Sequence, residues 1–150
     1  METRPSRGSS WTGVLSFGFF LLLIGAIWIV TPSFTEEVTD FINDFHLVKI
    51  SENVSLPAPA HSHPVVFTAV MQFCFIFGAL QVIILGLRFV FHESLNKKAD
   101  TVSGIAFWFS AGYFSNMLAN EAMGWFGFLA GLIICFGLAI VISSVVKLFR

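Results

Sequence analysis

The chain has 150 residues, of which 56% are hydrophobic and only 11% are charged, and its formal net charge is -1. A soluble domain carries about 25% charged residues because water must wet its surface. The composition therefore excludes an ordinary soluble domain, and the lack of a basic patch excludes a nucleic-acid-binding protein. It predicts an all-α integral membrane protein whose apolar surface is covered by lipid.

Four apolar runs are long enough to cross a bilayer as helices, which takes about 20 residues each. They cover residues 11–31, 65–91, 101–123 and 124–148. The first run is too long for a signal-peptide core and is followed by Pro32, so we expect an uncleaved span. The third run is the least apolar, and we expect it to face protein rather than lipid. The sequence thus predicts one four-transmembrane-helix bundle over residues 1–150.

Basic residues indicate the orientation of this bundle. With four spans, all lysines and arginines except Lys49 fall on one side of the membrane: Arg4, Arg7, Arg88, Lys97, Lys98, Lys147 and Arg150. The positive-inside rule then places both termini in the cytoplasm.

Residues 32–64 form the predicted extracytoplasmic loop. Ser33 and Glu36 match a capping box, in which each side chain bonds a backbone N–H of the other's turn. Apolar residues then recur at helical spacing from Phe34 to Phe45, opposite an acidic face, which predicts a short amphipathic helix. The proline-rich remainder should run extended. It includes a formal glycosylation sequon at Asn53, whose occupancy the sequence does not determine.

Two histidines in this loop form an H-x-H pair. In an extended chain, His61 and His63 point to the same side, as two ligands of one metal ion must. Glu121, at the outer end of the third run, is the third candidate ligand for zinc or copper, and His46 is another. No second histidine or cysteine pair supports such a site, so the sequence favours an ordinary loop pair and no resident cofactor.

A stripe of small residues in the fourth run predicts close helix packing. Its members repeat every four residues: Gly127, Gly131, Cys135, Ala139 and Ser143. Small side chains let two helix backbones approach each other in lipid. The partner helix can belong to this chain or to another. Cys135, like Cys74, is expected to pack rather than to form a disulfide.

Polar side chains within the spans need hydrogen-bond partners. Gln72 and Asn116 lie about 10 Å below the outer membrane face on their helices, at a rise of 1.5 Å per residue. We expect these two amides to meet, with Asn120 one turn from Asn116. The alternative is that these amides line a watery path.

The sequence contains no nucleophile elbow, phosphate loop or zinc-protease motif, and we expect no enzymatic activity. We expect an accessory or structural subunit that packs against other membrane proteins, or against copies of itself. One alternative is a homo-oligomeric channel or small-solute pore lined by the polar face of the third span. Another is a metal-binding membrane protein that uses the outer histidines.

Overall fold

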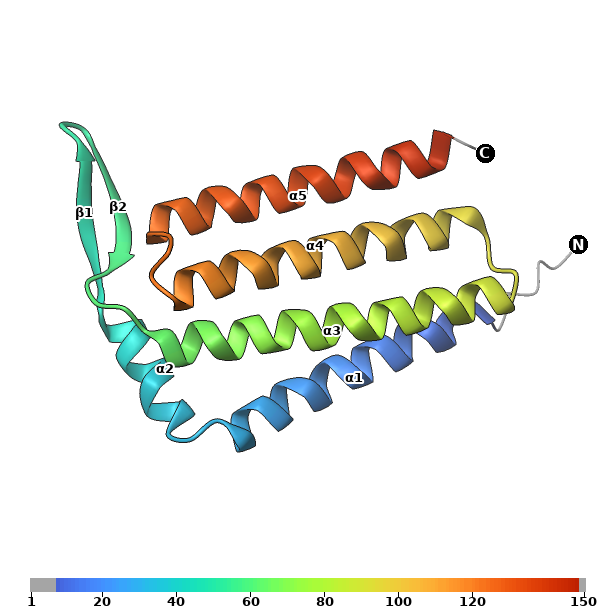
Figure 1. The fold of residues 1–150 in the computed structure, drawn as a ribbon, viewed down its shortest axis with the longest axis horizontal. Helices are drawn as coiled ribbons and strands as arrows, with labels where there is room; N and C mark the ends of the chain where they lie inside the picture. The colour runs from blue at the N-terminus through green and yellow to red at the C-terminus, as the bar shows by residue number, and fades with distance from the viewer. Residues whose placement is uncertain (1–7, 149–150) are drawn as a thin grey trace, which may run out of the picture.

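The computed structural model describes residues 8–148, with side-chain surroundings from residue 13 onward. This part of the chain folds into five helices and one β-hairpin (Figure 1). In chain order the elements are α1 Gly8–Val30, α2 Phe34–Asn43, β1 Phe45–Ser51, β2 Val54–Pro59, α3 Pro64–Val90, α4 Leu95–Ala119 and α5 Trp125–Leu148. The four long helices run side by side, and α2 and the hairpin lie together at one end of them.

Three helices are long and apolar enough to cross a membrane. Within the described residues these are the segments Gly13–Val30, Pro64–Val90 and Trp125–Leu148. They confirm the prediction of a mostly helical, membrane-associated chain. Helix α4 is as long as the others but less apolar, because Lys97, Lys98 and Asp100 lie in its first turns. A fourth crossing, by α4, therefore stays a prediction.

The third predicted span, residues 101–123, differs in its bounds from the helix in this part of the chain. Helix α4 begins at Leu95 and ends at Ala119. The charged first turns looked like loop in the sequence, although lysine is a good helix former. At the other end, Glu121 adopts a φ of 56°, which a continuing right-handed helix does not allow. Glu121 therefore lies in the turn between α4 and α5.

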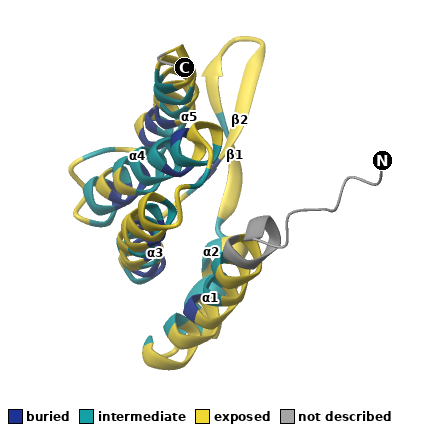
Figure 2. Ribbon diagram, turned by 90° about the vertical axis from the view of Figure 1, so that its right-hand side faces the viewer, coloured by how far each residue is buried: buried dark blue, intermediate teal, exposed yellow. Residues whose placement is uncertain are grey.

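The long helices form an open row in the order α1, α3, α4, α5. Helix α4 packs against α3 on one side and α5 on the other, whereas α1 has its main contacts with α3. Seen along the helices, α1 lies to one side of the other three (Figure 2). These contacts do not support a closed four-helix bundle.

The loop differs from the prediction in two ways. The capping box is wrong, because Ser33 has a φ of 53° and its side chain makes no cap hydrogen bond. The helix also ends at Asn43, and Phe45 begins strand β1, which pairs antiparallel with β2 from Phe45–Pro59 to Lys49–Ser55. The sequence reasoning expected an extended proline-rich segment but missed the strand that pairs with it.

Candidate functional site

The two loop histidines converge on one carboxylate, that of Asp44. His61 Nδ1 lies 2.8 Å from Asp44 Oδ1, and His63 Nε2 lies 3.0 Å from Asp44 Oδ2. The backbone N–H of His61 also donates to Asp44 Oδ2, at 2.7 Å. Asp44 follows α2 directly, and His63 directly precedes α3. This Asp44 cluster therefore joins the end of α2 and the base of the hairpin to the start of α3.

The Asp44 cluster favours an ionised carboxylate. The hydrogen bond from the backbone N–H of His61 lowers the pKa of Asp44 most, and the side chains of His61 and His63 lower it further. The pKa lies well below the ordinary range of an aspartate, because each of these bonds is to the charged form. Asp44 is thus a fixed negative charge over the whole neutral and mildly acidic pH range.

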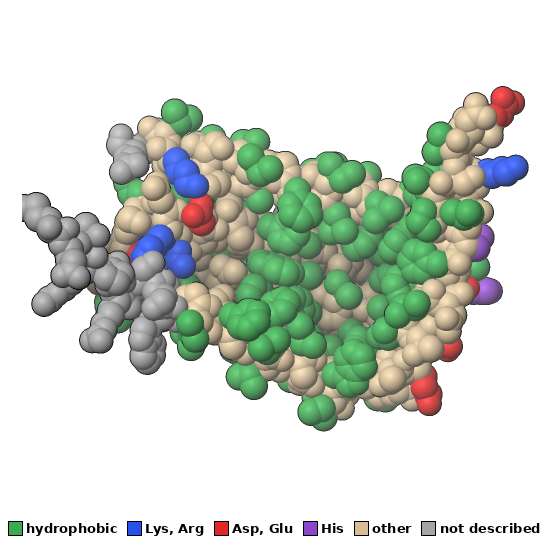
Figure 3. Space-filling view, turned by 180° about the vertical axis from the view of Figure 1, so that it is seen from behind, with side chains coloured by type: hydrophobic (Ala, Val, Ile, Leu, Met, Phe, Trp, Pro, Cys, Tyr) green, Lys and Arg blue, Asp and Glu red, His purple; other side chains and the backbone are tan. Residues whose placement is uncertain are grey.

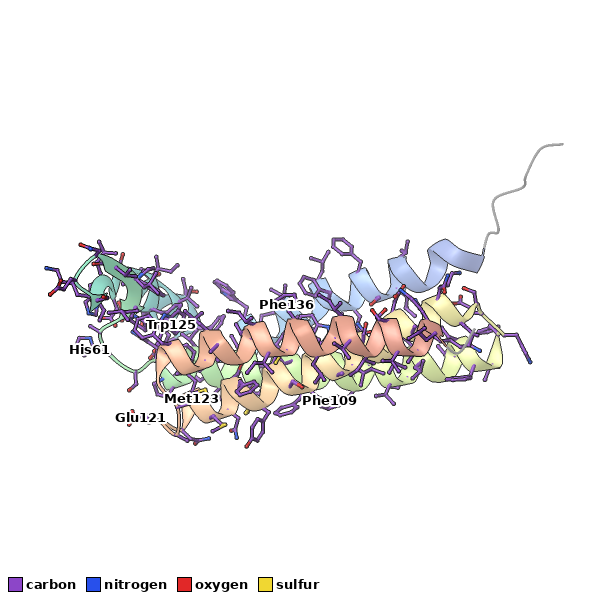
Figure 4. All side chains as sticks on the ribbon, turned by 90° about the horizontal axis from the view of Figure 1, so that it is seen from above. His61, Phe109, Glu121, Met123, Trp125 and Phe136 are labelled. Carbon is purple, nitrogen blue, oxygen red and sulfur yellow. The ribbon has the colours of Figure 1, made fainter. Side chains whose placement is uncertain are left out.

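The predicted metal ligands are only partly brought together. His61 and Glu121 line one open hollow of about 260 Å³, at the same end of the molecule as Trp125 (Figure 4). His63 is buried and turned toward Asp44. His46 is exposed, with its Nδ1 3.4 Å from the backbone oxygen of Asp44.

Asp44 occupies one ring nitrogen of each histidine, Nδ1 of His61 and Nε2 of His63. Among the described residues, no group of three or more His, Cys, Asp or Glu side chains could hold a metal ion. A zinc or copper site stays a hypothesis from the sequence. Asp44 itself was missed, because nothing in the sequence links it to histidines 17 and 19 positions away.

An aromatic cluster holds the hairpin and α2 against the long helices. The indole of Trp125, in the first turn of α5, lies 5.5 Å from the Phe45 ring and 6.1 Å from the Phe41 ring, centroid to centroid. Trp125 Nε1 also donates a hydrogen bond to the backbone oxygen of Pro57, at 3.1 Å. Beneath these rings lies the core formed by Phe67, Leu118 and Phe128. The hairpin and α2 are therefore packed against the ends of the long helices.

The small-residue stripe of α5 lies largely against α4. Gly131 and Cys135 are buried, and a Cβ atom on Gly131 would come within 2.8 Å of the Phe114 ring. Ser143 donates a hydrogen bond to Asp100 of α4, at 3.2 Å. Ala139 is half-buried, and Gly127 is exposed beside Met123. At Gly131, Cys135 and Ser143 the partner helix is thus in the same chain.

The amides of the spans pair differently from the prediction. Asn120 Nδ2 donates to both the side-chain and the backbone oxygen of Asn116, each at 2.9 Å. Gln72 is exposed on α3, and no hydrogen bond joins it to Asn116 in the described part of the chain. Cys74 and Cys135 are both buried and free, as their packing role requires.

The chain was compared with protein-family models, with curated proteins and with solved structures, and none of them matches it.

Proposed function

We propose that the chain is a four-span membrane protein that serves as an accessory or structural subunit of a larger membrane assembly, and that it is not an enzyme. Helix α4 crosses the bilayer between α3 and α5, although it is less apolar than they are. Two small residues in the middle of α4 are covered by its neighbours: Ser115 is only 1% exposed, and Gly112 faces Cys74 and Phe75 of α3. The exposed polar residues Asp100 and Asn120 lie near its two ends. Polar groups inside a membrane are tolerated where protein covers them.

The proposed orientation places both termini in the cytoplasm. The basic residues Arg88, Lys97, Lys98 and Lys147 lie at one end of the long helices, and the acidic helix α2 lies with the hairpin at the other end (Figure 3). Of the described lysines and arginines, Lys49 alone lies at the hairpin end, and such a bias of basic residues is what the positive-inside rule describes. Arg4, Arg7 and Arg150, which entered the same prediction, lie outside the described residues.

The main support for a partner protein is the exposed surface of α1. Only 6% of its membrane-spanning segment is buried. Gly18 and Gly25 lie seven residues apart and hence on one face, and a Cβ atom on either would meet nothing within 4 Å. Exposed Leu22 and Ile29 lie on the same face. Glycines let helices approach closely but offer nothing to lipid, so this α1 face fits another helix.

The same geometry gives less support to a homo-oligomeric channel. The buried hydroxyl of Ser115 donates to the backbone oxygen of Ala111 in its own helix, at 2.8 Å. Asn116 accepts its side-chain bond from Asn120. The Ser115 hydroxyl and the side-chain oxygen of Asn116 thus have partners within α4, which leaves them less able to hydrogen-bond water on an axis between protomers.

Photo-cross-linking in the native membrane tests the proposal. A photoreactive phenylalanine analogue replaces Leu22 on the α1 face or, as a control of equal exposure, Ile133 on α5. We expect Leu22 to yield an adduct with one different membrane protein and Ile133 to yield mainly lipid adducts. An adduct between two copies of this chain would favour the channel, and lipid adducts at both sites would overturn the subunit proposal.

A further inference from the structure

A cleft opens between α1, α3 and α4 near the basic end of the helices. It has a volume of about 610 Å³, within the roughly 300–1,000 Å³ typical of small-molecule sites. Helix α1 contributes Ser16, Phe17 and Phe20 to its lining, whereas α3 contributes Phe77, Gln81 and Arg88. Because α1 packs mainly on α3, the cleft is open sideways, toward the lipid that surrounds α1.

One end of this cleft is aromatic. Phe20 of α1 lies 5.7 Å from Phe77 of α3, and Phe77 lies 5.0 Å from Trp108 of α4, measured between ring centroids. All three rings line the cleft. This end offers a smooth apolar wall at a depth where the surrounding medium is hydrocarbon.

The other end of the cleft is polar and contains Arg88, Asp100 and Thr101. Asp100 and Trp108 are eight residues apart on α4, so the two ends are separated by about 12 Å along the helix. Gln81 lies between them. The cleft therefore changes from apolar to polar along its length, as a phospholipid does from its acyl chains to its headgroup.

The polar end has a surplus of positive charge. The carboxylate of Asp100 is held by Lys147 Nζ at 2.8 Å, and that of Glu93 lies 3.5 Å from Arg88 Nε and 3.9 Å from Lys97 Nζ. Lys98 lies outside the cleft, over the ring of Phe89. Arg88 is largely buried, and one of its terminal nitrogens donates to the backbone oxygen of Lys97. Its Nε and the Glu93 Oε2 that faces it both lack a hydrogen-bond partner among the described residues. This end therefore suits an anion that accepts hydrogen bonds.

We propose that the cleft binds an anionic phospholipid, with the headgroup phosphate at Arg88 and one acyl chain along the wall of Phe20, Phe77 and Trp108. Anionic lipids are concentrated in the cytoplasmic leaflet, and basic pockets between membrane helices bind their headgroups. Guanidinium groups bind phosphate oxygens in a fork-like geometry. The proposal rests on the proposed orientation, which places this end of the helices in the cytoplasmic leaflet, and it holds whether or not another subunit binds the α1 face.

Native mass spectrometry of the full chain, released from nanodiscs of equal parts phosphatidylglycerol and phosphatidylcholine, tests this site. We expect the wild type to retain phosphatidylglycerol selectively. Arg88→Gln should lower that selectivity about fivefold, the effect of one basic residue near an anionic membrane. Arg88→Lys should keep most of it, and so should Lys98→Gln, which removes the same charge outside the cleft. Equal retention of both lipids by the wild type would overturn the proposal.

A second variant addresses the cleft without changing charge, in case Arg88→Gln fails to fold. Ser16→Phe fills part of the cleft and should reduce the retained phosphatidylglycerol, whereas Leu22→Phe, on the α1 face outside the cleft, should not. Unchanged retention in Ser16→Phe would contradict the proposal. Inorganic phosphate should not displace the lipid; if it did, and bound the lipid-free protein as well, the site would be one for a free anion.

Discussion

Helices α1 and α4 differ in opposite ways from what their compositions suggest. Helix α1 is apolar all round, yet Leu23 is its one buried hydrophobic side chain in the described part of the chain. Helix α4 is the least apolar of the long helices, yet it lies between two others and buries Ala111, Gly112 and Ser115. In lipid, burying apolar surface gains little, so helices associate where small and polar residues allow close packing. Apolar content indicates that a helix crosses the membrane, and small residues indicate where it packs.

The largest difference in stability should come from replacing one glycine where α5 packs on α4 and one glycine on α1. Gly131→Leu places a side chain into the ring of Phe114, since even a Cβ atom would come within 2.8 Å of it. Overpacking of this kind costs about 3 kcal/mol of unfolding free energy. Unfolding in mixed detergent micelles, followed by tryptophan fluorescence, measures this cost.

Gly25→Leu on α1 is the matched control, because a Cβ atom there meets nothing within 4 Å. We expect its unfolding free energy to stay within about 0.5 kcal/mol of the wild type. Equal destabilisation by the two substitutions would mean that α1 packs as tightly as α5 does.

The contact between α1 and α3 should be weaker and mostly aromatic. The ring of Phe20 lies 5.3 Å from Phe73 and 5.7 Å from Phe77, edge to face in both pairs. Phe20→Ala removes both pairs, at a cost of about 1–2 kcal/mol. Spin-label distances between α1 and α3 should broaden, while those between α4 and α5 stay sharp. A sharp α1–α3 distance in this variant would show that other contacts hold α1.

The ion pair at the basic end should contribute less still. Lys147 Nζ lies 2.8 Å from Asp100 Oδ1, but the Asp100 side chain is 62% exposed. Water and salt screen such pairs, so Asp100→Asn should cost only about 0.2–1 kcal/mol. The difference from the wild type should shrink in high salt. A larger cost that is independent of salt would show that this pair is shielded from water.

The Asp44 cluster should affect the hairpin and its attachment to α2 and α3. The pKa of the Asp44 carboxyl group is lower in the folded protein than the value of about 3.9 in an unfolded chain. The carboxylate therefore stabilises the hairpin fully above about pH 4, and that stability is lost as the pH falls toward the folded pKa.

Hydrogen exchange of β1 and β2 measures this loss. We expect the protection factors of the wild type, which correct for the intrinsic pH dependence of amide exchange, to fall below about pH 4, and those of Asp44→Asn to be low at every pH. The unfolding free energy of the α3–α4–α5 layer should not change in this variant. A pH-independent wild-type hairpin would contradict the role of Asp44.

The sequence could predict the helices of the membrane but not the hairpin or the histidine partner. Long apolar runs and a four-residue repeat of small side chains are local patterns, and they indicated α1, α3, α5 and the packing stripe around Gly131. Strand β1 pairs with β2, which is close in sequence, but Phe45 at its start also packs against Trp125, which is distant. The partner of His61 and His63 is likewise 17 and 19 residues away. The spacing of neighbouring residues in the sequence predicts neither contact.

Lipid accessibility along α1 and α4 tests the central claim most directly. Single spin-labelled cysteines, placed in a background lacking Cys74 and Cys135, are exposed to oxygen in reconstituted bilayers. The account predicts high accessibility at Leu22 and Ile29 of α1 and low accessibility at Ala111, Ser115 and Leu118 of α4. Uniformly high accessibility around α4, or low accessibility at Leu22 and Ile29 in the chain reconstituted alone, would contradict it.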